Sequence, residues 1–452
     1  MLKAYEEYRK TPEAVWYTKI PTVWESKKMR AVFSERVTKV SDKEYPALSV
    51  GKMGVVPQLE NAVKTDNGDN RKLICEGDFA INSRSDRKGS SGISDYTGSA
   101  SLIITVLKPF KLLNRRFYHY LLRSNGFIEE FYRNGHGLVA DLWTTKWSEM
   151  RNIYIPIPPR EEQDQIVRYL DWKISEMNRF IHQKKKQIKM LRELRLSLID
   201  NAVTKGIDNE ELKESGHVWI GKIPKHWNME YSKHFFFLRR EKARESDEQL
   251  TSSQLYGIIS QKKFMEIENR RVTVVITGDD ILKHVETGDF VISMRSFQGG
   301  IEYSTMGGKI SSAYVMLIPN HEFVNDEYFR WLLKSPSYIK ALQGTSDLVR
   351  DGQALRYSNF AKVYLPRVPL DEQQRIAEYL NQKTPQIDEA ISEIRREISL
   401  VEELKVKLIF DVVTGQVDVR DEVILVYEMD SDADEMDDNV DKELSGENID
   451  EE

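Results

Sequence analysis

Cationic side chains set among small residues are the groups in this sequence best suited to bind a polyanion. Residues 82–91 (NSRSDRKGSS) hold Arg84, Arg87 and Lys88 between serines and glycines, directly after an expected strand. Guanidinium and ammonium groups donate hydrogen bonds to phosphates, and arginine can also pair with guanine. This segment is therefore a candidate nucleic-acid contact, and the alternative is an ordinary solvated loop.

Further loops carry polar side chains of the same kinds. Arg295 and Gln298 have suitable groups for bidentate contacts to guanine and adenine, respectively. The candidates in these further loops are Arg295 and Gln298 in residues 293–298, Arg350, Gln353 and Arg356 in 345–356, His136 and Lys146 in 135–146, Lys52 in 48–52, and Lys262 and Lys263 in 256–263. The sequence does not distinguish phosphate contacts from base contacts among them.

Motifs for catalysis are missing from the sequence. There is no Asn/Asp-Pro-Pro-Tyr/Phe motif for amino methylation, no glycine fingerprint for a methyl donor and no G-x-x-x-x-G-K-[ST] phosphate loop. The eight histidines form no His-x3-His pair, and no G-x-S-x-G is present. The single cysteine, Cys75, excludes an intrachain disulfide and a cysteine cluster for a metal. We expect a binding protein with no catalytic residues, metal or cofactor of its own.

The elements that would position these loops occur twice. Residues 16–24 (WYTKIPTVW) match 219–227 (WIGKIPKHW), 77–79 (GDF) match 288–290, 120–124 (YLLRS) match 331–335 (WLLKS), and 155–163 match 365–373 through a proline and a Glu-Gln pair. The matches are collinear, with offsets between 203 and 211 residues. A period of this length is too long for a solenoid repeat and indicates two copies of one domain.

Each copy is followed by a long heptad pattern. The seam positions are Val167, Leu170, Ile174, Met177, Ile181, Lys184, Ile188, Leu191, Arg195, Leu198 and Ala202 in the first helix, and Ala377, Leu380, Thr384, Ile387, Ile391, Ile394, Ile398, Val401, Lys405, Leu408 and Val412 in the second. One helix cannot bury its own apolar stripe. Antiparallel pairing within the chain is our preferred interpretation, and two parallel homodimeric coiled coils are the alternative. Pro385 predicts a kink in the second helix.

We therefore predict an α+β chain. Two similar mixed α/β domains are joined by two long antiparallel helices that form a coiled-coil spacer, with approximate two-fold symmetry. The expected boundaries are 1–158 and 206–368 for the domains, 159–205 and 369–415 for the helices, and 416–452 for an acidic tail that we expect to be disordered. Within the first domain, residues 114–134 have the apolar spacing of a helix.

Charge is distributed unevenly along the chain. Residues 421–452 hold 15 acidic residues and one lysine, a net charge of −14, so the other 420 residues carry +8 within the overall −6. A mildly basic body is compatible with a nucleic-acid partner. No apolar run is long enough to cross a membrane and the N-terminus has no apolar signal core, so we expect a cytoplasmic protein.

The order of these motifs resembles the specificity subunit of type I restriction-modification systems. The resemblance lies in residues 156–163 (PIPPREEQ) with Ile166 and Leu170, repeated as 366–373 (PRVPLDEQ) with Ile376 and Leu380, in the helix ends 203–206 (VTKG) and 413–415 (VTG), and in the domain openings 219–227 and, more loosely, 16–24. In this family a proline-rich step and a Glu-Gln pair precede a long helix that ends near Val-Thr-Gly. The resemblance covers about residues 1–418.

The resemblance implies that each domain is a target recognition domain that binds one part of a split, asymmetric DNA target. The helices would act as a ruler and dock two modification (methyltransferase) subunits, which restriction (translocase/endonuclease) subunits then join. S-adenosylmethionine, ATP and Mg²⁺ would bind the partner subunits only, and the specificity subunit would be non-catalytic. Two alternatives stay open: a two-site DNA-binding adaptor of another defence system, and an enzyme such as a nuclease with an unrecognised active site.

Overall fold

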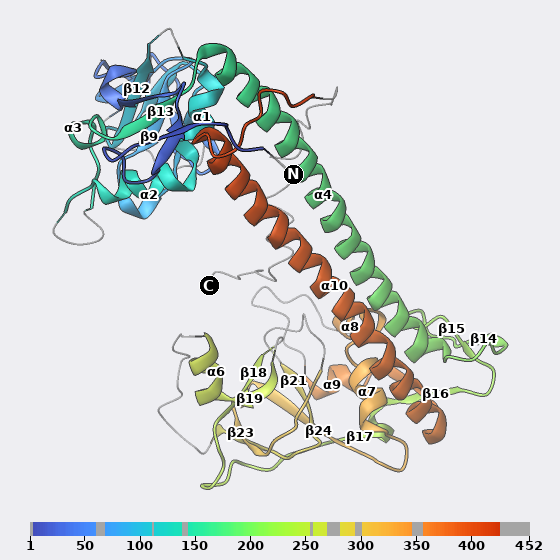
Figure 1. Cartoon of the computed structure of the whole chain (residues 1–452). Helices are drawn as coiled ribbons and strands as arrows, with labels where there is room; N and C mark the ends of the chain where they lie inside the picture. Colours follow the sequence, from blue (N-terminus) through green and yellow to red (C-terminus); the bar gives the residue numbers. More distant parts are fainter. Residues whose placement is uncertain are drawn as a thin grey trace. The chain divides into compact units, whose positions relative to one another are not determined.

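The computed structural model describes residues 3–59, 68–110, 113–137, 143–253, 256–268, 281–293, 301–345 and 356–424. The chain divides into two compact units (Figure 1). Unit 1 comprises Met1–Lys185 and Arg395–Glu452, and unit 2 comprises Lys186–Ile394. Each unit combines a mixed α/β domain with parts of two long helices, so the predicted fold class is confirmed.

Unit 1 contains short strands and short helices before its first long helix. They are β1 (Tyr8–Lys10), β2 (Lys19–Pro21), β3 (Glu25–Lys28), η1 (Met29–Ala31), β4 (Phe33–Glu35), β5 (Lys39–Val40), β6 (Leu48–Gly51), β7 (Gly54–Pro57), β8 (Arg71–Ile74), β9 (Phe79–Asn82), η2 (Ser85–Arg87), β10 (Ser91–Ile93), β11 (Gly98–Ala100), β12 (Ile104–Pro109), α1 (Arg115–Arg123), α2 (Asn125–Arg133), α3 (Trp147–Met150) and β13 (Tyr154–Ile157).

Unit 2 contains a corresponding series. It consists of β14 (Leu212–Glu214), β15 (Lys222–Pro224), β16 (Asn228–Tyr231), α5 (Ser232–Phe235), β17 (Phe236–Leu238), β18 (Leu250–Ser253), β19 (Gly257–Ser260), α6 (Gln261–Glu268), β20 (Lys283–Val285), β21 (Phe290–Ser293), β22 (Glu302–Tyr303), β23 (Gly308–Ile310), β24 (Tyr314–Pro319), α7 (Asp326–Leu332), α8 (Pro336–Gln343), α9 (Tyr357–Phe360) and β25 (Tyr364–Arg367).

The same antiparallel sheet is built in both units. Its order is β10-β9-β12-β4 in unit 1 and β22-β21-β24-β17 in unit 2. The register repeats as well, because Leu107 of β12 lies opposite Glu35 of β4, and Leu317 of β24 lies opposite Leu238 of β17. The sequence repeat is therefore a repeat of structure, down to individual strand partners.

A serine interrupts the predicted helix 114–134. Ser124 has an extended backbone (φ −64°, ψ 144°) and separates α1 from α2. Ser335 has nearly the same conformation (φ −70°, ψ 145°) and lies between α7 and α8, where its side chain caps α8. Residues 114–134 are therefore two helices: the Ser124 hydroxyl donates to the Leu121 carbonyl at 2.7 Å at the end of α1, a local interaction that apolar spacing does not register.

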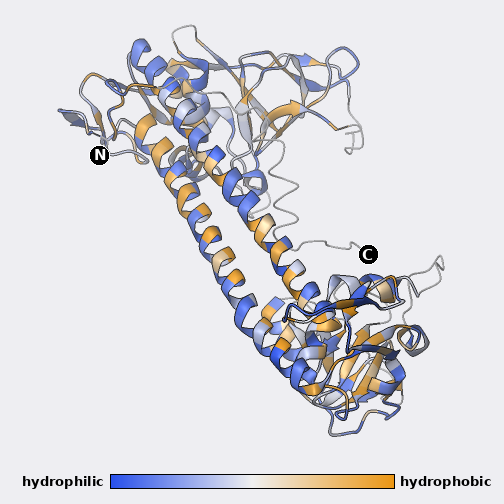
Figure 2. Ribbon diagram, turned by 90° about the vertical axis from the view of Figure 1, so that its right-hand side faces the viewer, coloured by the Kyte–Doolittle hydropathy of each residue, from blue (hydrophilic) through white to orange (hydrophobic). Residues whose placement is uncertain are grey.

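Two long helices, α4 (Arg160–Lys205) and α10 (Leu370–Val413), have 46 and 44 residues. Unit 1 holds the first part of α4 and the last part of α10, and unit 2 holds the remainder of each, so the helices pair antiparallel within both units (Figure 1). None of the predicted seam positions is exposed. Figure 2 shows polar and apolar residues alternating along both helices. The predicted antiparallel coiled coil is confirmed.

Polar residues in the seam have partners on the other helix. In unit 2, Arg195 Nε lies 2.9 Å from Asp388 Oδ1. In unit 1, Lys405 Nζ donates to Asn178 Oδ1 at 2.8 Å, which is the same pair of positions 210 residues apart. Lys184 pairs with Glu397 in unit 1. These cations interrupt the apolar seam, yet each is paired within the chain.

Helix α10 passes through Pro385 without ending there. The Thr384 hydroxyl donates to the Leu380 carbonyl at 2.8 Å, one turn earlier. The predicted kink at this proline stays a prediction.

Among the described residues, no helix combines the length and apolar character that a membrane crossing requires.

The glutamine of each Glu-Gln pair fastens a long helix to its own domain. Gln163 is buried; its Oε1 accepts from the Asn114 backbone N–H at 2.8 Å and its Nε2 donates to the Pro158 carbonyl at 2.9 Å. Gln373 makes the two corresponding backbone bonds, both at 2.8 Å. One amide side chain thus satisfies a donor and an acceptor that would otherwise be buried without partners.

The glutamate of each pair binds the opening segment of the same domain. Glu162 accepts a hydrogen bond from the Tyr5 hydroxyl. Glu372 accepts one from Trp227 Nε1 at 3.0 Å and lies 2.8 Å from His226 Nε2. The Glu-Gln motif is therefore explained by packing, because both side chains are buried and paired within their unit.

The start of the expected acidic tail is part of unit 1. Val419 is completely buried, and Gln165 Nε2 donates to the carbonyls of Val419 and Glu422 at 3.0 Å each. Asp418 forms an antiparallel backbone β-bridge with Lys3. The prediction of disorder is wrong for residues 416–424, because an apolar residue between the acids packs into the core. Residues 425–452 lie outside the described residues.

An arginine–aspartate pair is repeated at the strand ends of the main sheet in each unit. Arg36 Nε and Nη2 donate to Asp78 at 2.6 and 3.0 Å, and Arg239 Nε and Nη2 donate to Asp289 at 2.6 and 2.9 Å. These bidentate bonds hold the pKa of both arginines above the ordinary value. Bidentate pairs have a specific geometry, so they fix the strand ends from which the loops leave the sheet.

A buried histidine in unit 2 lies between two carboxylates. His284 Nδ1 is 2.7 Å from Asp247 Oδ2, and its Nε2 is 2.9 Å from Glu286 Oε1. Burial lowers the pKa of His284 and the nearby Arg244 lowers it further, but the hydrogen bonds to both carboxylates outweigh these effects and raise it overall. The protonated histidine therefore stabilises the folded unit.

This pair of contacts predicts a pH-dependent stability. Because the pKa is raised on folding, the contribution of His284 is complete below its unfolded pKa of about 6.5 and is lost as the pH rises through its folded pKa. The denaturation midpoint of the wild-type chain should therefore decrease as the pH rises from the unfolded pKa through the folded pKa of His284. In His284→Asn, the decrease in midpoint that is due to this histidine should be absent. His321→Asn, at an exposed histidine, is the control. Equal pH profiles for wild type and His284→Asn would contradict the assignment.

Candidate nucleic-acid interface

The structure describes nine of the thirteen candidate contact residues. Lys52, Arg84, Arg87, Lys88, His136 and Lys146 belong to unit 1, and Lys262, Lys263 and Arg356 belong to unit 2. Arg295, Gln298, Arg350 and Gln353 lie outside the described residues.

Two segments that are distant in sequence meet in unit 1. Thr144 forms backbone β-bridges with both Arg84 and His136. The Thr145 N–H donates to the Ser83 carbonyl at 3.0 Å. The end of β9 is thereby tied to the segment that leads into α3. Lys146 is the residue immediately before α3, where its own N–H donates to Glu149 Oε2 at 2.9 Å.

These segments form one side of an open groove of about 580 Å³. Arg84, Lys146 and Arg151 line it, and all three side chains are exposed. None of the three makes an ion pair with another described residue. Three uncompensated cations around one groove form a surface that attracts phosphate groups.

The floor and walls of the groove contain further groups. Lys72 on β8 and Glu35 on β4 form an ion pair, with Nζ 3.3 Å from Oε1. Leu102, Ile103 and Trp147 supply apolar surface. The groove therefore offers cations, one carboxylate, and apolar contacts that suit a sugar or a base.

Other predicted cations are held away from this groove. Lys88 Nζ pairs with Glu129 at 2.5 Å and lies 4.9 Å from the centre of the Tyr132 ring. Arg87 Nε lies 3.6 Å from Asp86 Oδ2. Lys52 occupies the turn between β6 and β7, where its carbonyl accepts from Arg123. His136, Arg87, Lys88 and Lys52 do not line the groove.

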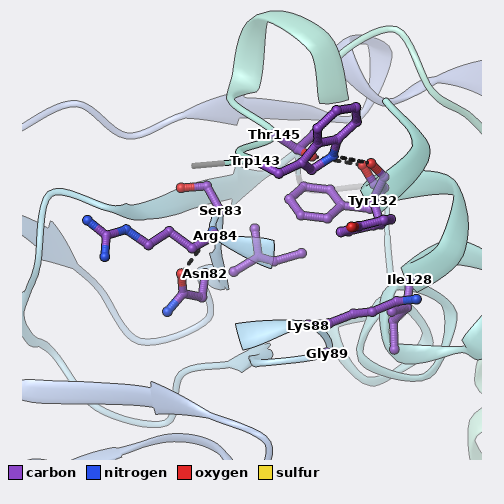
Figure 3. A pocket seen from close by; sticks show the side chains of 11 residues that line it. Asn82, Ser83, Arg84, Lys88, Gly89, Ile128, Tyr132, Trp143 and Thr145 are labelled. Atoms are coloured by element: carbon purple, nitrogen blue, oxygen red, sulfur yellow. Dashed lines mark hydrogen bonds between the residues drawn. The ribbon is translucent and has the colours of Figure 1, made fainter. Parts of the chain in front are cut away.

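A small cavity of about 10 Å³ lies behind the Arg84 loop. Trp143 Nε1 donates to the Tyr132 carbonyl at 2.9 Å, and the two rings are 6.0 Å apart. Figure 3 shows Arg84 directed away from this aromatic pair, and Lys88 alongside Ile128. The cavity has no room for a base, so the aromatic pair acts as an anchor for the loop that presents Arg84.

The cations of unit 2 occupy helix starts. Lys262 and Lys263 are exposed in the first turn of α6, which was expected to be a loop. Arg356 immediately precedes α9, and its N–H donates to Asn359 Oδ1 at 3.0 Å. Arg356 thus repeats the position of Lys146 in unit 1.

Sequence reasoning missed three charged side chains of the groove, Arg151, Glu35 and Lys72. Arg151 could have been found, because it is a cation only five residues after Lys146 in the sequence. Glu35 and Lys72 could not, because only strand pairing brings β4 and β8 beside the Arg84 loop. Among the described residues, no three His, Cys, Asp or Glu side chains are placed to hold a metal ion.

Comparison with known proteins was made for sequence and for fold. The family profile described as "Type I restriction modification DNA specificity domain" matches residues 19–190. The chain is 23% identical over 398 residues to the putative type I restriction enzyme MjaX specificity subunit of Methanocaldococcus jannaschii, covering 85% of this chain and 87% of that protein. It is 25% identical over 289 residues to the MjaVIII specificity subunit of the same organism, covering 60% and 63%.

Solved structures share the fold. A chain from work described as "Structural basis underlying complex assembly and conformational transition of the type I R-M system" has a TM-score of 0.66 at 14% identity, covering 89% of this chain and all of that chain. The HsdS subunit from Thermoanaerobacter tengcongensis has a TM-score of 0.50 at 16% identity, covering 90% and 100%. The resemblance found in the repeated motifs is confirmed by these comparisons.

Proposed function

We propose that this chain belongs to the type I restriction-modification specificity-subunit family and that it supplies the DNA-sequence recognition of such a complex. The observation that carries the proposal is the duplication of one recognition domain together with one long helix. Each domain would bind one part of a split, asymmetric duplex target. The paired helices would set the spacing between the two parts.

Within unit 1, we assign the DNA contact to the groove lined by Arg84, Lys146 and Arg151. The three cations have no intrachain ion pair among the described residues, so their charge is available to a phosphate backbone. In unit 2, Arg356 would have the role of Lys146, because both residues precede a short helix after the same repeat interval. The other predicted contacts, Lys52, Arg87, Lys88, His136, Lys262 and Lys263, stay secondary candidates.

Repeated apolar patches support the docking of partner subunits. Unit 2 exposes Met190 and Leu194, one turn apart on α4, at 54% and 55%, and unit 1 exposes Leu400 and Leu404 of α10, at 55% and 53%. Each residue of the second set follows its counterpart by 210 positions. Single exposed apolar residues are common, but the same set exposed twice favours two copies of one partner.

We assign these patches to two modification subunits. In this proposal the methyl donor S-adenosylmethionine binds those subunits, and ATP and Mg²⁺ bind restriction subunits that join them. The specificity chain catalyses nothing itself and works in the cytoplasm, where its DNA target lies. The lack of methyltransferase and translocase motifs in the sequence is in accord with this division of labour.

Reconstitution with modification subunits tests the function directly. The complex should methylate adenines in one split, asymmetric DNA motif, and the purified chain alone should neither methylate nor cleave DNA. The measurement is sequencing of modified bases on a plasmid library after incubation with S-adenosylmethionine. Cleavage or methyl transfer by the chain alone would refute a non-catalytic role, and failure to bind any modification subunit would favour a DNA-binding adaptor.

The groove assignment predicts a uniform, salt-dependent loss of binding. Lys146→Ala and Arg151→Ala should each weaken duplex binding about tenfold at every sequence and reduce the slope of log K against log salt by about 0.9, because each removes one phosphate contact. Binding of the complex is measured by fluorescence anisotropy between low and moderate salt. Lys88→Ala, whose ammonium pairs with Glu129, is the matched control. An unchanged slope in both groove variants would contradict the assignment.

The patches predict independent loss of partner subunits. Met190→Glu with Leu194→Glu should weaken one docking event about 30-fold or more, and Leu400→Glu with Leu404→Glu the other, because each introduces charges into an apolar contact. Native mass spectrometry should then show complexes with one modification subunit in place of two. The exposed Glu193→Gln is the control. Retention of two subunits in either double variant would rule the patch out.

A further inference from the structure

The groove of unit 1 contains a carboxylate among cations. Glu35 is the last residue of β4 and pairs with Lys72 of β8, whose Nζ is 3.3 Å from Glu35 Oε1. Both side chains are largely covered, with 23% and 17% of their surface exposed. Arg84, Lys146 and Arg151 line the same groove. A negative group at this point opposes the binding of a phosphate.

The repeat shows that the fold does not require an acid here. Leu238 occupies the same strand register in unit 2, opposite Leu317 as Glu35 is opposite Leu107. Unit 2 keeps a lysine at the position of Lys72. This residue is Lys283, whose Nζ donates to the Tyr314 carbonyl at 2.6 Å. The sheet thus accommodates either residue, so Glu35 is a local difference between two otherwise matching frameworks.

The Glu35 carboxylate has room for a second hydrogen-bond donor. Lys72 is placed on Oε1, and among the described residues no donor is placed on Oε2. A carboxylate accepts several hydrogen bonds, so pairing with Lys72 holds it in place without saturating it. Glu35 is one of the residues that line the groove, together with the cations that would direct the groove toward DNA.

Base chemistry narrows the possible donor. In the major groove, a carboxylate accepts a hydrogen bond from the N4 amino group of cytosine. Adenine also presents an amino group, but its neighbouring N7 is an acceptor that repels a carboxylate. Guanine and thymine present acceptors at the corresponding positions.

We infer that Glu35 is a specificity-determining residue that accepts a hydrogen bond from a cytosine in the half-site bound by unit 1. This inference rests on the proposed function. Arg84, Lys146 and Arg151 contact the backbone and set the register, and Glu35 selects the base.

Two substitutions at Glu35 test the inference in the complex with modification subunits. Binding is measured on duplexes that each carry one changed base pair of the target. Glu35→Leu, which copies Leu238, should reduce discrimination at one cytosine position by about 10- to 100-fold and leave the other positions unchanged. Glu35→Gln should shift the preference at that position toward adenine, because an amide pairs with adenine N6 and N7.

The controls separate the outcomes. Lys146→Ala should weaken all sequences equally, and thermal denaturation reports whether each variant keeps its fold. A selective wild-type complex whose ranking of sequences is unchanged in Glu35→Leu would overturn the inference alone. So would a uniform loss accompanied by a lower melting temperature, which would make Glu35 a structural partner of Lys72. A wild-type complex without any preferred sequence would overturn the proposed function itself.

Discussion

Burial of the apolar seam between α4 and α10 is the constraint on which the rest of the structure depends. Each helix has an apolar stripe that it cannot bury alone, and the stripe of the other helix removes it from water. The polar interruptions do not break this arrangement, because Arg195 lies against Asp388 and Lys405 donates to Asn178. The same cross-pair in both units also favours one register, since a shift would leave these cations without partners.

The Glu-Gln pair at the start of each long helix attaches that helix to its own domain. Gln163 bonds two backbone groups and Gln373 bonds three, so the start of a long helix cannot rotate without leaving buried polar groups unpaired. Glu162 and Glu372 tie down the opening segments in the same way. This motif therefore fixes each long helix to its own domain, and its side chains are buried and paired within their unit.

Differences between the units carry more functional information than their similarities. The arginine–aspartate pairs and the sheet order repeat, as a common framework requires. Glu35 and Leu238 occupy one position of that framework and differ in charge. Two domains that bind different half-sites need such differences on a constant scaffold, because strand geometry positions the groups and side-chain chemistry selects the base.

The sequence by itself determined the duplication, the two long helices and the Arg84 and Lys146 candidates, because heptad periodicity, collinear motifs and loop composition are local patterns. It did not determine that Ser124 separates two helices, that Val419 packs into unit 1, or that Lys88 is paired with Glu129 away from the groove. Only the tertiary structure decided which groups share the groove. Strand pairing brings Glu35 and Lys72 beside Arg84 and Arg151, and pairing between distant strands leaves no signal in the spacing of residues along a single chain.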